Sequence, residues 1–405
     1  MSNSWKAVAV APADPSRVTR VAMAGTFDAE NFGDALFPLL AERELGERLP
    51  GLELVAYGLR ARPRASWAYE VRPLSALAGE VDGFDLLLIG GGHLLRHDKR
   101  LAPGYVPEGD VHLPTGLWFA PTLVAVAAGV PVAWNALGAS PRWPSWTLPL
   151  LRSAAEATSY RSVRDRDSRD ALERAGVRDV VVVPDTALGI RRLELPRAQG
   201  IDGPYALLQP TSALLPRLHD VRLFRDAADR AGLRVLEVPI GPIHGDRPGM
   251  FGRAGTVKLD VGFDPLALAG LIAGAEAVCG HSLHLAYVAA AHGVPVYRPA
   301  APAAQKHRHL TRFPGIHELG ARPFRFGRRE PGAEVAEAEH AVGRHWDRVA
   351  ALAGRGEPAA SRSSIVRLAV DLPGRLEPRA LVPTWRRPLA PVWARRARGA
   401  LRRLM

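Results

Sequence analysis

The sequence contains one cysteine, Cys279, in 405 residues. A single thiol forms no intrachain disulfide and builds no cysteine-based metal site, so both kinds of structure are excluded, and nothing suggests redox chemistry. We expect neither a bound metal nor a resident cofactor. A reducing compartment such as the cytoplasm suits this composition.

Uninterrupted apolar runs are also scarce. Residues 1–20 lack the continuous apolar stretch that a secretory signal requires. Residues 113–141 carry no charge, but Pro121, Gly129 and Pro131 cut this segment into pieces too short to cross a membrane. A buried helix followed by a buried strand explains the segment better, and we expect a cytoplasmic protein.

Acidic residues are missing from the end of the chain. Residues 379–405 contain eight arginines and no Asp or Glu, and the whole chain has a net charge of +12. Such charge is typical of nucleic-acid binders, but no helix-turn-helix, zinc-finger or base-stacking signature accompanies it. We expect no nucleic-acid partner, and an Arg-rich nucleic-acid-binding protein remains an alternative.

The basic tail, residues 356–405, has two interpretations. Within residues 391–405, Ala397, Leu401 and Leu404 form an apolar stripe flanked by arginines, which would suit an anionic membrane surface. A peripheral contact at the inner face of the cell membrane would bring the protein to a lipid-linked partner. A basic extension without fixed structure, or a helix docked on the body, fits equally well.

The body of the chain alternates between apolar runs and helical spacing. The length and the hydrophobic content of 47% provide for two domains. We expect the first at residues 18–195, with strands at 18–24, 52–57, 85–89, 131–137 and 179–183 and helices at 34–45 and 167–175. We expect the second at residues 203–330, with strands at 205–209, 234–239, 277–279 and 294–297 and helices at 223–231, 265–273 and 285–291. A helix at 334–352, within the segment 331–355, precedes the tail.

A short internal sequence repeat supports this division into two domains. Residues 127–132 (AAGVPV) recur as residues 291–296 (AHGVPV), and both indicate a helix, a glycine cap and a strand. We therefore predict an α/β fold of two Rossmann-like doubly wound domains that face each other across a cleft, with a basic C-terminal appendage. In such sheets ligands bind beyond the carboxyl ends of the strands.

Two glycine-containing loops follow predicted strands. In residues 25–34, backbone amides at a helix start suit an anion, and Asn31 or Asp34 can cap the helix. Gly90, Gly91 and Gly92 directly follow a buried strand, where missing side chains let a ligand or another backbone approach.

Charged residues follow two further strands. Around Arg164, Asp165 or Asp167 suits a helix cap, and one arginine suits a carboxylate or phosphate through paired hydrogen bonds. Asp185 also ends a strand, where a capping acid and a functional carboxylate give the same signal.

Two histidines lie at another strand-to-helix junction. His281 and His284 flank Ser282 without a companion Cys, Asp or Glu, so a metal site is disfavoured. A histidine that titrates near neutral pH at a helix start is better interpreted as an acid or base.

Taken together, these segments resemble the polysaccharide pyruvyl transferase family. The resemblance covers about residues 20–300 and rests on residues 31–34 (NFGD), 85–92 (DLLLIGGG), 163–165 (VRD), 184–185 (PD) and 282–284 (SLH) ahead of 293–295 (GVP). It implies a glycosyltransferase-B-like pair of domains and phosphoenolpyruvate as co-substrate, with no other cofactor. The acceptor it implies is a sugar of a cell-surface glycan, such as an exopolysaccharide, or of its lipid-linked precursor.

The resemblance also implies residue roles. The catalytic histidine falls on His284 and an anion-binding arginine on Arg164. The family usually carries an arginine two residues before that histidine, where this chain has Ser282. We predict that His281, Lys306 or Arg308 takes its place, and that Ser282 belongs with them to the donor-binding residues.

The chemistry of phosphoenolpyruvate assigns the remaining candidates. Protonation of its methylene carbon, for which His284 is the candidate acid, makes the neighbouring carbon electrophilic toward sugar hydroxyls. Arg164 and Gly90–Gly92 are predicted to serve the donor's anions. Asp28, Asn31 and Asp34 are predicted to bind the acceptor sugar. A nucleotide-sugar-dependent glycosyltransferase and a family member without activity remain alternatives.

Overall fold

The computed structural model describes residues 18–97, 115–197, 200–252, 255–256, 263–299, 310 and 312–355. Two of the predicted site residues, Lys306 and Arg308, lie outside these ranges, as do the predicted basic tail 356–405 and its membrane-contacting part 391–405. Among the described helices, none combines the length and the apolarity needed to cross a bilayer.

The first half of the chain is built on a parallel five-stranded sheet with the order β3-β2-β1-β4-β5. Its strands are β1 (Arg20–Ala24), β2 (Glu53–Gly58), β3 (Val71–Pro73), β4 (Leu86–Ile89) and β5 (Val132–Trp134). Its helices are α1 (Phe32–Gly46), α2 (Leu77–Glu80), α3 (Phe119–Ala127), α4 (Leu148–Ala157) and α5 (Arg166–Arg174). Alternate residues of β1 enter two different cores, because helices cover both faces of the sheet.

A short pair of strands extends this sheet. β6 (Ser162–Val163) pairs in parallel with β7 (Val181–Val182). Isolated parallel bridges join Ala133 to Tyr160 and Leu137 to Val163. The carboxyl end of β6 therefore lies on the same edge as the ends of β4 and β5.

The second half repeats this topology. Its parallel sheet has the order β10-β9-β8-β11-β12-β13, with the strand that comes first in the sequence again inside the sheet. The strands are β8 (Tyr205–Leu208), β9 (Arg234–Glu237), β10 (Gly255–Thr256), β11 (Ala277–Cys279), β12 (Val296–Arg298) and β13 (Ile316–Glu318), and the helices are α6 (Leu218–Arg230), α7 (Pro265–Gly274) and α8 (Leu283–Ala291).

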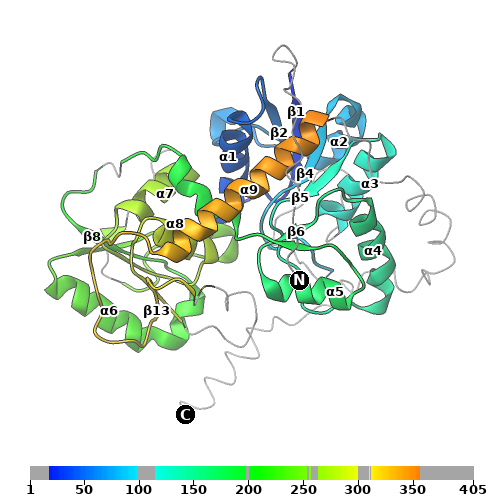
Figure 1. Ribbon diagram of the computed structural model, residues 1–405. Helices are drawn as coiled ribbons and strands as arrows, with labels where there is room; N and C mark the ends of the chain where they lie inside the picture. Colours follow the sequence, from blue (N-terminus) through cyan, green and yellow to red (C-terminus); the bar gives the residue numbers. More distant parts are fainter. Residues whose placement is uncertain are drawn as a thin grey trace, which may run out of the picture.

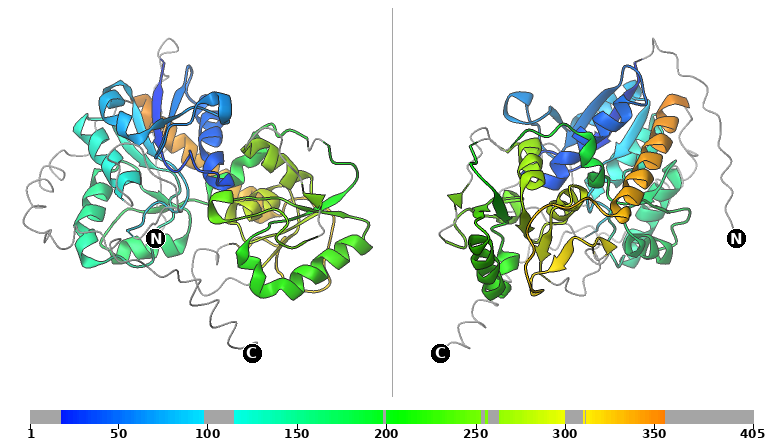
Figure 2. Two further views of the ribbon diagram at one scale, coloured as in Figure 1. Left: turned by 180° about the vertical axis from the view of Figure 1, so that it is seen from behind. Right: turned by 60° about the vertical axis from the view of Figure 1, so that its left-hand side comes forward.

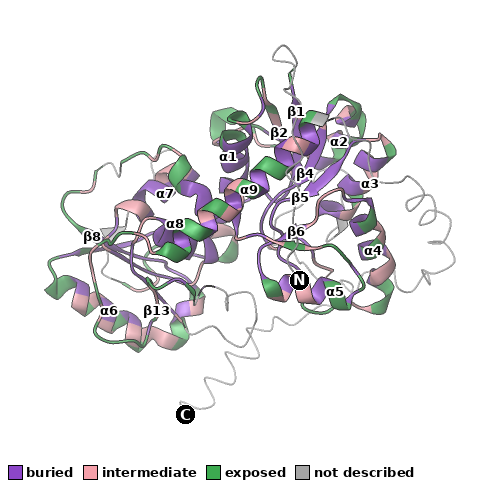
Figure 3. Cartoon of the chain, in the orientation of Figure 1, coloured by how far each residue is buried: buried purple, intermediate pink, exposed green. Residues whose placement is uncertain are grey.

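The last described helix, α9 (Ala333–Arg355), runs across both halves (Figures 1 and 2). Val335 and Ala338 pack into the core around the second sheet, whereas Trp346 and Val349 pack beneath β1. Figure 3 shows the buried strands inside both halves and the exposed side of α9. The predicted glycosyltransferase-B-like pair of doubly wound, Rossmann-like units is thus confirmed.

Most predicted elements are found, with shifted ends. The helix-then-strand interpretation of residues 113–141 is confirmed by α3 and β5, and in the internal sequence repeat Gly129 and Gly293 both adopt positive φ between helix and strand. The predicted strand 131–137 ends early, at Trp134, because Ala136 adopts a φ of 46° that no strand accommodates. The predicted helix 223–231 begins earlier, at Leu218.

A buried histidine fixes α9 to the first sheet. His345 is fully enclosed, with Nε2 at 3.0 Å from Asn135 Oδ1 and Nδ1 at 3.2 Å from the Tyr160 hydroxyl. Burial, assisted by the nearby Arg48, lowers the pKa of His345 to about 3. The imidazole is therefore neutral in the folded protein at every physiological pH.

This depressed pKa predicts acid sensitivity. His345 takes up a proton in the unfolded chain below about pH 6.5 but not in the folded protein, so stability falls as the pH drops from 6.5 toward 3. Between pH 7 and pH 5 the wild type should lose about 2 kcal/mol more than His345→Gln, measured by urea unfolding at both pH values. His340→Gln, on the exposed side of α9, should follow the wild type. Equal pH dependence in all three proteins would refute this role.

Candidate active site

Most of the described candidate residues lie where the strand order reverses in each sheet. In the first sheet this point lies between β1 and β4, which are followed by residues 25–31 and 90–92; in the second it lies between β8 and β11, followed by residues 209–211 and 280–282. Ligands of open α/β sheets bind at such points. The Phe32 N–H donates to the Ile240 carbonyl at 3.0 Å, which joins the two edges directly.

His284 lies in the first turn of α8, and side chains hold the loop of residues 280–282 that precedes this helix. The Gln209 carboxamide oxygen accepts from the His281 and Ser282 N–H groups, both at 2.8 Å. Ser282 occupies the N-cap of α8, and its hydroxyl accepts from the Leu285 N–H at 3.4 Å. In this chain Ser282 thus begins the helix that carries His284.

The imidazole of His284 packs directly on the backbone of the first half. A Cβ atom placed on Gly33 would lie 1.7 Å from His284 Nδ1, so only glycine leaves room for the ring. The Phe37 ring meets the imidazole edge to face, with centroids 5.4 Å apart. The His284 side chain is 9% exposed.

The three glycines after β4 make room for neighbouring groups. Added Cβ atoms would lie 2.2 Å from the Phe27 ring at Gly90 and 2.4 Å from the Phe37 ring at Gly91. Gly92 has a φ of +87° and faces the Asp34 carboxylate. Their observed contacts are therefore internal packing, and the donor-binding role remains a prediction.

Asp185 joins the candidate histidine to the candidate arginine. Its Oδ1 accepts from the Ala187 N–H at 3.1 Å, and its Oδ2 lies 3.5 Å from both His284 Nε2 and Arg164 Nη1. Burial alone would raise the pKa of Asp185, but His284, Arg164 and the Ala187 N–H together hold it below its usual value. Asp185 is thus a buried, ionised carboxylate that both caps a turn and faces the histidine.

Arg164 follows β6 and is almost fully enclosed, with 3% of its side chain exposed. Besides Asp185, it faces Asp165, whose Oδ2 lies 3.6 Å from its Nε. Asp165 also caps α5 by accepting from the Ser168 N–H at 2.6 Å, as its position indicates. Two carboxylates oppose this one guanidinium, so its service to a bound anion remains a prediction.

The predicted acceptor residues separate into two groups. Asp34 Oδ2 accepts from the Thr26 hydroxyl at 2.7 Å and from Asn31 Nδ2 at 2.9 Å. Asn31 Nδ2 also lies 3.3 Å from His244 Nε2 of the second half. The expected helix-capping bond from Asn31 is absent although the residue occupies the N-cap of α1, because its amide is turned toward Asp34. Asp28 is fully buried and accepts from the Leu59 N–H at 3.1 Å, which anchors its loop to β2.

Three residues of this junction were missed by the sequence analysis as site members. Asp185 had an ambiguous signal, and His244 had none. Arg298 ends β12, is 5% exposed, and donates from Nη2 to the His281 carbonyl at 3.1 Å. Cys279 is buried at the end of β11, and burial raises the pKa of its thiol, which disfavours a nucleophilic role.

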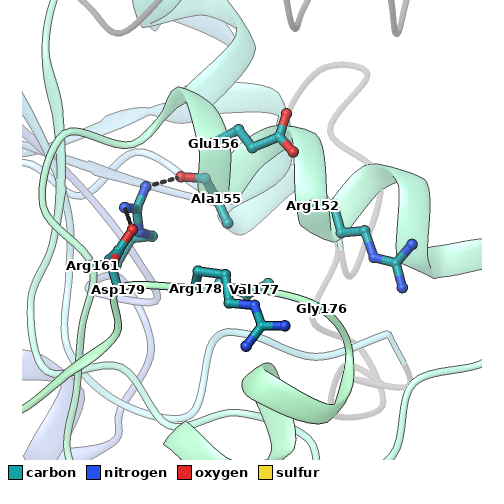
Figure 4. Close-up of a pocket in the computed structure, with 8 residues that line it drawn as sticks. All are labelled: Arg152, Ala155, Glu156, Arg161, Gly176, Val177, Arg178 and Asp179. Carbon is teal, nitrogen blue, oxygen red and sulfur yellow. Dashed lines mark hydrogen bonds and ion pairs between the residues drawn. The ribbon is translucent and has the colours of Figure 1, made fainter.

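A pocket of about 120 Å³ lies elsewhere in the first half, beside α4 (Figure 4). Two of its arginines bond the ends of helices: Arg152 Nε donates to the Ala175 carbonyl at 2.7 Å, and Arg161 Nη1 donates to the Ala155 and Thr158 carbonyls. These bonds satisfy carbonyls that a helix end leaves open. The residues that line this pocket include none of those that follow β1, β4, β8 or β11.

The close approach at Gly33 yields a direct test. Gly33→Ala should destabilise the fold by about 1–3 kcal/mol, because the new methyl group collides with the His284 ring. Gly46→Ala, at the other end of α1, meets no atom within 4 Å and should be neutral or slightly stabilising. Urea unfolding measures both changes. Equal stability of the two variants would contradict the packing described.

Comparison with solved structures finds chains of similar architecture. The UDP-GlcNAc 2-epimerase from Methanocaldococcus jannaschii is 13% identical, with 87% of this chain and 99% of that chain covered and a TM-score of 0.48. The UDP-GlcNAc 2-epimerase from Neisseria meningitidis bound to UDP-GlcNAc is 10% identical, with 88% and 100% covered and a TM-score of 0.45. The glycosyltransferase SnogD from Streptomyces nogalater is 16% identical, with 87% and 99% covered and a TM-score of 0.36.

Comparison by sequence gives the family. No curated protein matches the chain. The sequence model of the family described as polysaccharide pyruvyl transferase matches residues 31–298, which make up well over half of the chain. The match begins at Asn31, ends at Arg298 and includes Arg164, Asp185 and His284. The chain therefore belongs to the polysaccharide pyruvyl transferase family, whose members are transferases that act on polysaccharide.

Proposed function

We propose that the protein transfers a pyruvyl group from phosphoenolpyruvate to two hydroxyls of one sugar, in a cell-surface glycan or its lipid-linked precursor. Family membership supports a transferase that acts on polysaccharide. The observation that carries the finer proposal is the buried pair of His284 and ionised Asp185 at the junction of the two sheets. Such a pair suits proton donation to carbon, which the transfer requires.

The reaction balances without an oxidant or a metal. A proton adds to the methylene carbon of phosphoenolpyruvate, and the oxygen of one sugar hydroxyl bonds to the neighbouring carbon. The bond from that carbon to the phosphate oxygen breaks, and phosphate leaves with the electron pair. A second hydroxyl oxygen then closes the cyclic ketal. Of the two hydroxyl protons released, one replaces the proton consumed and one goes to the phosphate.

His284 is the acid in this proposal. Its Nε2 is buried and has no hydrogen-bond partner among the described residues, because Asp185 Oδ2 at 3.5 Å is too distant for a good bond. Nε2 is therefore the nitrogen that can address a substrate, since Nδ1 lies against Gly33. Asp185 faces Nε2 with a buried negative charge, because His284 and Arg164 help to hold its own pKa low.

The sugar acceptor is assigned to the polar groups around α1. Asn31 and Asp34 are only partly buried and lie at the edge where the two halves meet, with His244 approaching from the second half. Carboxylate, amide and imidazole groups in one place suit the hydroxyls of a sugar. Asp28 enters this assignment only as the residue that anchors the loop.

The test is transfer by the full-length protein. Phosphate release from phosphoenolpyruvate should depend on a glycan acceptor. His284→Gln should lower kcat by about 10²-fold to 10⁴-fold, as loss of an acid catalyst does. His292→Gln is the matched control, because His292 ends the same helix and its Nδ1 bonds only the Val288 carbonyl at 3.0 Å among the described contacts. It should retain wild-type kcat.

Parallel reactions with nucleotide sugars test the alternative function, glycosyl transfer. Acceptor-dependent release of a nucleoside diphosphate, without release of phosphate from phosphoenolpyruvate, would replace pyruvyl transfer by glycosyl transfer. Wild-type kcat in His284→Gln would remove the histidine from the mechanism.

A further inference from the structure

The charges around His284 do not by themselves suit an anionic donor. Arg164 faces Asp165 at 3.6 Å and Asp185 at 3.5 Å, so two carboxylates oppose one guanidinium. Phosphoenolpyruvate brings a phosphate and a carboxylate to the same place. Buried like charges repel strongly, so a further cation, beyond Arg164 and the His284 acid of the proposed mechanism, would favour a donor of this kind at this junction.

Arg298 provides a cation on the second half. It is the last residue of β12, which lies beside β11 in the parallel sheet, so its side chain starts at the edge from which the His284 loop emerges. Its Nη2 donates to the His281 carbonyl at 3.1 Å. The guanidinium therefore contacts the loop of residues 280–282, at a residue that precedes His284 by three positions in the sequence.

Tyr287 connects this guanidinium to the candidate site. It lies one turn after His284 on α8, with ring centroids 6.4 Å apart. Burial, together with the charges of Asp185 and Asp165 and against that of Arg164, raises the pKa of Tyr287. Arg298 interacts electrostatically with the same tyrosine. Arg164 and Arg298, from opposite halves of the chain, thus both interact electrostatically with this one buried tyrosine.

The charge and the burial of the Arg298 side chain suit the binding of an anion. Burial lowers its pKa to about 10, so the side chain remains charged at neutral pH in a poorly hydrated place. Coulombic attraction and charge-assisted hydrogen bonds are stronger there than in water. A guanidinium has five N–H groups in a planar fork, which can hold the His281 carbonyl and also address two oxygens of a phosphate.

We propose that Arg298 binds the phosphate group of the donor beside the His284 loop. This assignment rests on the proposed function for the identity of the donor. It places the cation on β12, whereas the sequence predicted it at His281, Lys306 or Arg308. Arg298 then neutralises the leaving phosphate, and Arg164 holds Asp185 against His284.

The experiment measures ligand binding by the full-length protein with Arg298→Gln and Arg298→Lys. Isothermal titration with phosphoenolpyruvate should show a Kd raised about tenfold or more in Arg298→Gln, the usual effect of losing a charged hydrogen bond. Arg225→Gln is the matched control, because Arg225 Nη1 also donates to loop carbonyls of the second half, those of Phe251 and Gly252. It should bind as the wild type does.

Each outcome decides the proposal. Wild-type affinity for phosphoenolpyruvate in Arg298→Gln overturns it. If Arg298→Gln does not fold, Arg298→Lys decides: loss of the planar fork should raise the Kd several-fold, and an unchanged Kd overturns the assignment.

Titration with UDP-glucose separates the two proposals. If the wild type binds UDP-glucose and not phosphoenolpyruvate, the proposed function fails. In that case weaker UDP-glucose binding by Arg298→Gln supports a phosphate site at Arg298. Unchanged UDP-glucose binding overturns that site. Binding of neither ligand by the wild type overturns both proposals.

Discussion

The close approach of the His284 imidazole to the backbone of Gly33 is the contact on which the candidate site depends. It joins the first turn of α8 to the first turn of α1, and therefore one doubly wound half to the other. Phe37 and Gly91 extend the same packing to the end of β4, so the ring is held from the first half although its own backbone belongs to the second. A side chain larger than hydrogen at position 33 would separate His284 from Asp185, which also lies in the first half.

Electrostatics and burial act together at this junction. Asp185 is enclosed and still ionised, because it faces both Arg164 and His284. Breaking one member of such a buried set leaves an uncompensated charge, which costs far more than a surface ion pair contributes. The same arrangement keeps the acid near an anion of fixed position and leaves the donor's phosphate to a separate cation. Arg298, enclosed at the end of β12, fills that need in our account.

The sequence predicted the architecture well and the site in part, for physical reasons. Continuous apolar runs mark strands buried on both faces, so β1, β4, β8 and β11 were recognisable, and with them the loops at the switch points. His284 and Arg164 followed from resemblance. Asp185 could not be assigned, since a capping acid and a functional carboxylate give one pattern. In the sequence, Arg298 is recognisable only as the end of a strand. The packing of Gly91 on Phe37 joins residues that are far apart in sequence and that only the tertiary fold brings together.

The central claim is that this junction protonates phosphoenolpyruvate and forms a ketal, and transfer in D₂O tests it most directly. NMR of the glycan product should show a pyruvyl ketal whose methyl group carries one solvent deuteron, formed in equal amount with inorganic phosphate. A product without a ketal methyl signal, or a ketal methyl without solvent deuterium, would contradict the account.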